Sequence, residues 1–124
     1  MASLNAVYLA GNLCADPEVR YVPSGDAVAN LRLAVTRRYR TQSGEQKDET
    51  LFITVVAWGR QAEVCGEYLR KGSPVLVEGQ LQQRSWETQE GDKRSVVEVR
   101  ARRVQFIGGK GTASAEEGEE SFEE

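Results

Sequence analysis

The 124-residue sequence has no histidine, only two cysteines and no apolar run approaching the ~20 residues that span a bilayer. The missing histidine removes the commonest general base near neutral pH. Two distant cysteines, Cys14 and Cys65, cannot form the usual zinc sites without it. We therefore expect no enzymatic activity, metal or cofactor. Both cysteines are interpreted as small buried residues in a reducing cytosol, although one disulfide is possible.

The first twelve residues also lack the features of a secretory signal. They have neither a basic start nor a long apolar stretch before a cleavage site. Hydrophobic residues make up 40% of the chain and charged residues 28%, which is ordinary for one small globular domain. We expect a cytoplasmic protein without membrane contact.

The charged residues are unevenly distributed along the chain. All 16 Lys and Arg residues lie between Arg20 and Lys110, whereas six of the 19 acidic residues occupy the last nine positions. The other 13 acidic residues leave the rest of the chain with a net charge of +3. This segregation predicts a basic domain over residues 1–108, suited to a polyanion, and a flexible acidic tail over 109–124.

Apolar and polar residues alternate with the period of two that is typical of β-strands. In the clearest run, Leu51, Ile53 and Val55 share one face and Phe52 lies on the other. A change of apolar phase near Arg103 predicts a β-bulge. The predicted strands are residues 4–14, 27–36, 50–58, 74–86 and 94–107.

One helix is predicted over residues 60–71, with a basic C-terminal end and Gly72 as its cap. Five strands with a short helix between the third and fourth are the element order of an OB-fold barrel, an all-β fold. The periodicity would also fit another small barrel.

Aromatic residues are interleaved with basic residues on three of these elements. Alternation places Phe52, Trp58 and Trp86 away from the apolar faces. Tyr39 has the parity of the apolar residues Leu33 and Val35, so alternation does not place its ring outside. Exposed rings can stack on bases, and cations can bind the phosphates between them. The basic residues that flank the rings are Arg32, Arg37, Arg38, Arg40, Arg60, Arg84 and Lys93.

Other interpretations of the same residues remain open. An aromatic side chain on a strand more often packs against its neighbours, and outward rings could instead fill a subunit interface. The barrel could bind RNA or a protein. A thiol enzyme that uses Cys14 or Cys65 would lack a histidine partner.

Several ordered motifs resemble those of bacterial single-stranded DNA-binding proteins, and the similarity covers about residues 4 to 108. The motifs are Val7-Tyr8-Leu9-Ala10-Gly11-Asn12-Leu13, Asp16-Pro17-Glu18-Val19-Arg20-Tyr21, Pro23-Ser24-Gly25, Val28-Ala29-Asn30, Trp58-Gly59-Arg60, Ala62-Glu63, Glu67-Tyr68-Leu69-Arg70-Lys71-Gly72 and Val77-Glu78-Gly79-Gln80-Leu81.

The resemblance implies an OB-fold homotetramer that binds and protects single-stranded DNA, largely without sequence specificity, in replication, recombination and repair at the nucleoid. The family's stacking positions fall on Tyr39, Phe52, Trp58 and Trp86. Many members carry Trp where this chain has Tyr39 and Phe52, and Phe where it has Trp58, so ring chemistry is kept at each position.

The C-terminal tail departs from the family pattern. Family tails commonly end in acidic residues followed by Pro-Phe, and that tip docks replication and repair enzymes. Here Phe122 is followed by Glu123 and Glu124. This ending makes recruitment of such partners through the tail doubtful, and the tail is interpreted as a disordered solubilising end that could compete with DNA.

Overall fold

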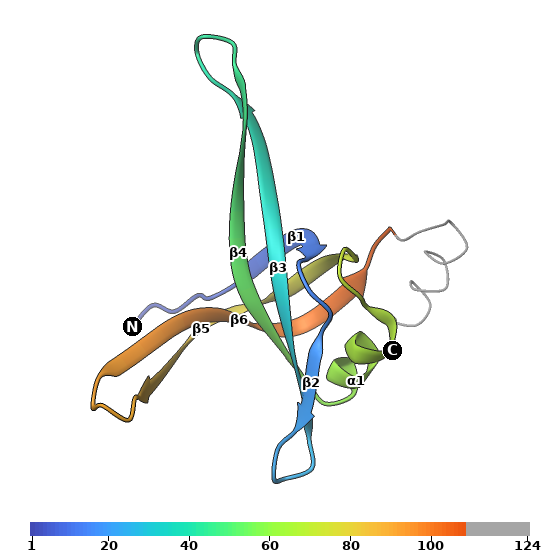
Figure 1. The fold of residues 1–124 in the computed structure, drawn as a ribbon, viewed down its shortest axis with the longest axis vertical. Helices are drawn as coiled ribbons and strands as arrows, with labels where there is room; N and C mark the ends of the chain where they lie inside the picture. The colour runs from blue at the N-terminus through green and yellow to red at the C-terminus, as the bar shows by residue number, and fades with distance from the viewer. Residues whose placement is uncertain (109–124) are drawn as a thin grey trace.

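The computed structural model describes residues 1–108 and contains six strands and one helix in that range. Figure 1 shows two long hairpins, β3–β4 and β5–β6, that project in different directions from the region where the strands meet. The predicted tail, 109–124, lies outside the described residues. The elements are β1 (Val7–Leu13), β2 (Glu18–Tyr21), β3 (Ala27–Arg40), β4 (Gln46–Trp58), α1 (Arg60–Tyr68), β5 (Pro74–Glu87) and β6 (Lys93–Phe106).

Five of the strands close into a barrel. β1 pairs with β5, β5 with β6, β6 with β4, β4 with β3, and β3 with β1. All of these pairings are antiparallel except β4–β6, in which Val55 lies opposite Val99 and Val56 opposite Arg100. The helix lies between the third and fourth barrel strands along the chain. The predicted five-stranded OB-fold is therefore confirmed.

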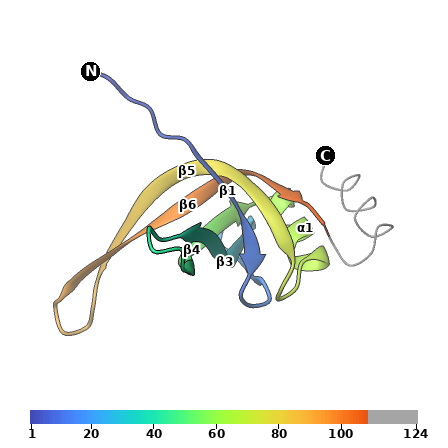
Figure 2. The same ribbon diagram turned by 90° about the horizontal axis from the view of Figure 1, so that it is seen from above.

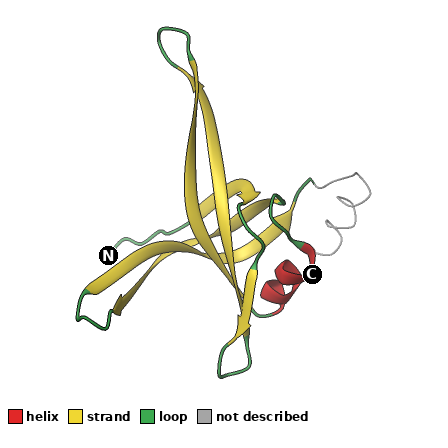
Figure 3. Ribbon diagram, viewed as in Figure 1, coloured by secondary structure: helices red, strands yellow, loops and turns green. Residues whose placement is uncertain are grey.

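The barrel is held together by its inward side chains. Because alternate residues of a strand point to opposite faces, Leu31, Leu33 and Val55 all project inward, and all three are completely buried. Burial of one such side chain contributes about 1.5–3 kcal/mol. Helix α1 adds Ala62 and Cys65 to the same core, and Figure 3 shows it packed beside the strands.

Both hairpins continue far beyond this core. Pairing in β3–β4 runs out to Arg40 opposite Gln46, and pairing in β5–β6 runs out to Glu87 opposite Lys93. Figure 2 shows the β5–β6 hairpin arching away from the barrel. Apart from one threonine in each turn, every residue in these outer parts is exposed. We call residues 36–50 the first arm and residues 83–97 the second arm.

The two arms end in the same kind of turn. The Thr41 Oγ1 accepts a hydrogen bond from the Glu45 amide at 3.1 Å, and the Thr88 Oγ1 accepts one from the Asp92 amide at 3.1 Å. One glycine in each turn has a φ near +90°, a conformation in which other residues are strained. Each arm is thus closed by a hydrogen-bonded turn, at residues 41–45 in the first arm and 88–92 in the second.

The predicted bulge is also present. Glu78 lies opposite Arg103, but the next residue, Gly79, lies opposite Ala101, so Arg102 is the extra residue on β6. A Cβ at Gly79 would collide with the carbonyl oxygen of Arg100. Glycine is therefore needed where β5 passes close to β6 beside the bulge.

Two details of the sequence prediction were wrong. The helix ends at Tyr68, three residues before the predicted end, because Leu69 is already extended with φ −95° and ψ 149°. Gly72 therefore belongs to the following turn and does not cap the helix. In addition, the exposed strand β2 (Glu18–Tyr21), which was not predicted, pairs with the start of β3.

Candidate nucleic-acid interface

The three aromatic residues predicted to point outward are all accessible. Phe52 is 54% exposed, Trp86 44% and Trp58 36%. Phe52 and Trp58 project from the side of β4 opposite to Val55 and Ala57, which are completely buried. None of these three rings is therefore needed to fill the core.

The β3–β4 register places several predicted cations on the face that carries Phe52. Phe52 lies opposite Ala34, and the next pair on the same face is Arg32 opposite Thr54. An Nη1 group of Arg32 donates a hydrogen bond to the Thr54 hydroxyl at 3.1 Å. Arg38 and Arg40 have the same parity farther along the first arm. Trp58, opposite Val28, also has this parity, so the face combines two rings with three guanidinium groups.

Tyr39 lies on the other face of the same hairpin. It is opposite Lys47, and its parity is that of the buried Leu33, so it cannot share a face with Phe52. The Arg37 guanidinium lies 4.6 Å from the Tyr39 ring centroid, and its Nη2 is 2.9 Å from the Glu49 carboxylate. The structure therefore divides the predicted residues of the first arm between two faces.

The second arm carries Trp86 on the outward face of β5. The Arg84 guanidinium lies 5.0 Å from the Trp86 ring centroid, within the range of a cation–π contact. Arg94 lies directly opposite Trp86, whereas Lys93, the predicted cation, lies opposite Glu87 and has the parity of the other face. Arg94 was not predicted, because the register that places it, and not Lys93, opposite Trp86 cannot be read from the sequence.

Arg100 is a further cation that the sequence prediction missed. Its guanidinium lies 5.2 Å from the Trp58 ring centroid. The contact follows from the parallel β4–β6 pairing, which places Arg100 opposite Val56, two residues from Trp58 on the same face. The only sequence signal was the polar parity of Arg100 on β6, which does not show that a ring lies nearby.

Three of the predicted cations on the arms and helix, Arg37, Arg38 and Arg60, form ion pairs with exposed carboxylates. Arg38 Nε is 3.2 Å from the Asp48 carboxylate, and Arg60, the first residue of α1, is 3.7 Å from Glu63. All four side chains are at least 43% exposed. Exposed pairs of this kind contribute only about 0–1 kcal/mol. A phosphate could therefore take the place of the carboxylate at little cost.

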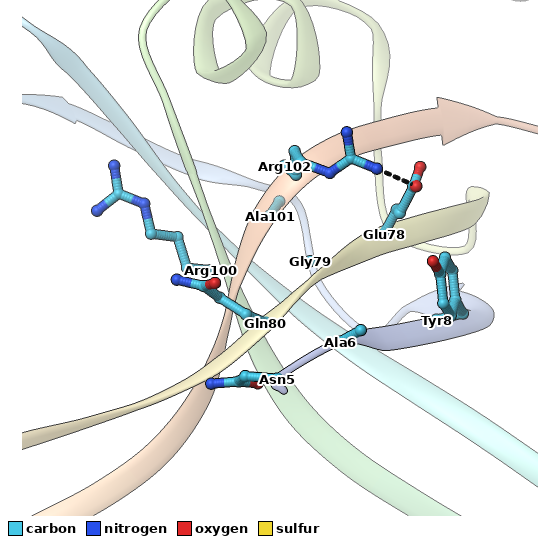
Figure 4. Close-up of a pocket in the computed structure, with 9 residues that line it drawn as sticks. All are labelled: Asn5, Ala6, Tyr8, Glu78, Gly79, Gln80, Arg100, Ala101 and Arg102. Atoms are coloured by element: carbon cyan, nitrogen blue, oxygen red, sulfur yellow. Dashed lines mark hydrogen bonds and ion pairs between the residues drawn. The ribbon is translucent and has the colours of Figure 1, made fainter. Parts of the chain in front are cut away.

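A hollow of about 430 Å³ lies outside the barrel between β1, β5 and β6. Figure 4 shows Glu78 paired with Arg102 on one side of it, while Arg100 extends toward the other side. None of the eleven predicted site residues lines the hollow, whose remaining walls include Asn5, Tyr8 and Gln80. The hollow is thus separate from the rings and adjoins them only through Arg100.

The two cysteines of the described chain are not bonded to each other. Cys65 is buried, and this burial raises the pKa of its thiol to about 12, so it stays protonated near neutral pH. Cys14 is only half-buried, which corrects the expectation that both are buried. Within residues 1–108, no cluster of side chains could hold a metal ion, and no helix has the length and apolar character to cross a membrane.

Comparison with known proteins shows which family this chain matches. The model of the "Single-strand binding protein family" matches residues 4–107. The chain is 43% identical over 123 residues to "Single-stranded DNA-binding protein 2" of Chlorobaculum tepidum, covering 98% of this chain and 82% of that protein. It is 46% identical over 109 residues to a "Single-stranded DNA-binding protein" of Wolinella succinogenes, covering 88% and 67% respectively.

A solved structure is similar as well. The crystal structure of a deletion mutant of the single-stranded DNA binding protein from Thermus aquaticus matches with a TM-score of 0.76 and 40% sequence identity. The match covers 87% of this chain but 52% of that one, so the present chain spans about half the length of that protein.

Proposed function

Because this chain belongs to the single-strand binding protein family, we propose that it binds single-stranded DNA largely without sequence specificity. Bases stack on Tyr39, Phe52, Trp58 and Trp86, and arginines bind the phosphates between them. The observation that carries the proposal is the repeated ring–guanidinium unit. Three separate rings each have an arginine within 4.6 to 5.2 Å of the ring centroid.

Stacking explains the preference for single strands. Every base has an apolar π-face, so a ring accepts all four bases, but duplex DNA hides those faces within the helix. The phosphate contacts release counterions, and affinity should therefore fall as salt is raised. All of these steps are equilibrium binding, and the function requires no catalytic group.

The biological setting belongs to the same proposal. A protein that coats exposed strands and opposes their re-pairing would serve replication, recombination and repair, in the cytoplasm at the nucleoid. Self-association as a homotetramer is supported by the exposed Tyr8 and Leu76, apolar side chains on paired strands β1 and β5. Light scattering of the full chain would give its subunit number.

The proposal predicts that Trp58→Ala and Trp86→Ala each weaken oligo-dT binding by about 1–3 kcal/mol. Tyr21→Ala is the matched control, because Tyr21 is 63% exposed on β2 and belongs to no ring–guanidinium unit in residues 1–108. Binding would be measured by filter retention or anisotropy with a labelled strand. Equal affinities for all four proteins would refute the stacking assignment.

A competition experiment separates the remaining alternatives. Labelled oligo-dT on the protein would be challenged with unlabelled oligo-dT, RNA of matched length and duplex DNA. Displacement by single-stranded DNA at far lower concentration than by the other two supports the proposal. Preferential displacement by RNA would instead favour the RNA-binding interpretation of this barrel.

A further inference from the structure

One charged side chain in residues 1–108 is buried, and it lies beside the Arg84–Trp86 unit. Glu98 on β6 is 3% exposed. Its Oε1 accepts a hydrogen bond from the Nε of Arg84 at 3.1 Å, and Arg84 also lies over the Trp86 ring. From this geometry, and resting on the proposed function, we propose that Glu98 is a positioning residue that orients Arg84 against Trp86 and cancels its charge.

The Arg84–Glu98 pair differs from the surface pairs of the first arm. The carboxylates that pair with Arg37 and Arg38 are 63% and 54% exposed, whereas the Glu98 side chain is 4% exposed. An exposed carboxylate can turn away when a phosphate arrives. A buried one cannot leave its partner without a large desolvation cost, because no water replaces the lost contact. Arg84 therefore stays paired when DNA binds.

The two tryptophans consequently have different electrostatic surroundings. Arg100 has the same parity as Glu98 and lies over Trp58, and it forms no ion pair within residues 1–108. The Arg100–Trp58 unit keeps its positive charge, whereas the Arg84–Trp86 unit is neutralised by Glu98. Phosphates should gather more strongly at the first unit, because at the second Arg84 adds no net charge and only Arg94, opposite Trp86, remains to attract them. Glu98 would thus help to decide where the DNA backbone runs.

Salt dependence of binding measures this difference. The full chain would be titrated with oligo-dT of one length at several salt concentrations, comparing wild type with Glu98→Gln. The amide oxygen of glutamine can still accept the Arg84 Nε–H, so the substitution removes mainly the charge. We expect the slope of log K against log salt to steepen by about 0.7 per bound chain, the value for one more phosphate contact on a single strand.

Glu78→Gln is the matched control. Tyr8 lies opposite Glu78, but no guanidinium lies over that ring in residues 1–108. Glu78 pairs instead with Arg102, across the same two strands as the Arg84–Glu98 pair. Its slope should equal that of wild type. A Glu98→Gln slope that also equals wild type would overturn the inference and leave the proposed function standing. A wild-type chain that does not bind oligo-dT would overturn both.

A double variant tests the same idea if Glu98→Gln fails to fold, as judged by its circular dichroism. Glu98→Gln with Arg84→Gln replaces a neutral ion pair by a neutral pair of amides, a change that buried pairs often tolerate. Since the wild-type Arg84–Glu98 pair has no net charge, the double variant should keep the wild-type slope of log K against log salt. A slope shallower by about 0.7 would show that Arg84 binds phosphate, and would overturn the inference.

Discussion

The two arms continue four of the five barrel strands outward, yet the barrel and the arms differ in what surrounds their side chains. In the barrel, Leu33 and Val55 are completely buried and paired strands enclose an apolar core. In the arms, Arg37 and Trp86 are exposed, and both faces of each hairpin meet solvent. In the barrel the inward side chains therefore hold the fold and only the outward ones, such as Phe52 and Trp58, are free to bind, whereas in the arms both faces are free.

Stability and binding therefore also separate between the two faces of a single strand. On β4, the buried Val55 lies between Phe52 and Trp58 in the sequence but points to the opposite side. A substitution of the inward residue should unfold the barrel, whereas a substitution of an outward ring should leave the fold intact and weaken DNA binding. Substitutions in the core, substitutions of the rings and labelling of the thiols each test this separation.

Leu31→Ala should lower the free energy of unfolding by about 2–5 kcal/mol, because it leaves a cavity in the barrel. Leu51→Ala is the matched control, since Leu51 shares the inward parity but lies next to the first arm and is 51% exposed. It should cost about 0.5 kcal/mol. Urea denaturation followed by circular dichroism would measure both. Equal losses would mean that the arms contribute to the core.

Phe52→Ala and Tyr39→Ala should differ in how their effects depend on DNA length, because the two rings lie on opposite faces of one hairpin. Phe52 shares its face with Trp58, so its loss should weaken binding of short and long oligo-dT alike by about 1–3 kcal/mol. The loss of Tyr39 should matter only for strands long enough to reach the other face. If both variants lose the same affinity for the shortest strand, the two-face description is wrong.

Thiol labelling should have the smallest effect on binding, and it tests how closed the barrel is. Because burial raises the pKa of Cys65 to about 12, this thiol should resist alkylation at pH 8, whereas the half-buried Cys14 should react. Mass spectrometry of peptides would locate the label. Oligo-dT affinity should not change. Rapid labelling of Cys65 in the folded protein would contradict the packing of α1 on the barrel.

Much of the fold could be predicted from sequence because alternation is a local property. The period of two identified the barrel strands, and it placed Phe52 and Trp58 on the outward face before any contact was known. The slip of phase near Arg103 located the bulge, which the structure puts at Arg102. The strand β2 (Glu18–Tyr21) was missed because a run of only four residues, all of them exposed, is too short for alternation to identify, although Val19 and Tyr21 do alternate with Glu18 and Arg20.

The missed residues depend on how distant strands pair. Arg100 reaches Trp58 only because β6 runs parallel to β4 in one particular register. The burial of Glu98 was missed as well, since neither its type nor its neighbours in sequence suggest an interior position. The helix end was overestimated because Leu69 fits the apolar spacing of a helix, although it is buried from an extended conformation.

The central claim is that unpaired bases lie against the outward tryptophan rings, and intrinsic fluorescence reports it most directly. The chain has two tryptophans, so Trp58→Phe and Trp86→Phe each leave one reporter in place. We predict that saturating oligo-dT quenches the emission of both variants, while duplex DNA of equal length leaves it nearly unchanged. Unaltered emission from both tryptophans in the fully bound protein would contradict the account.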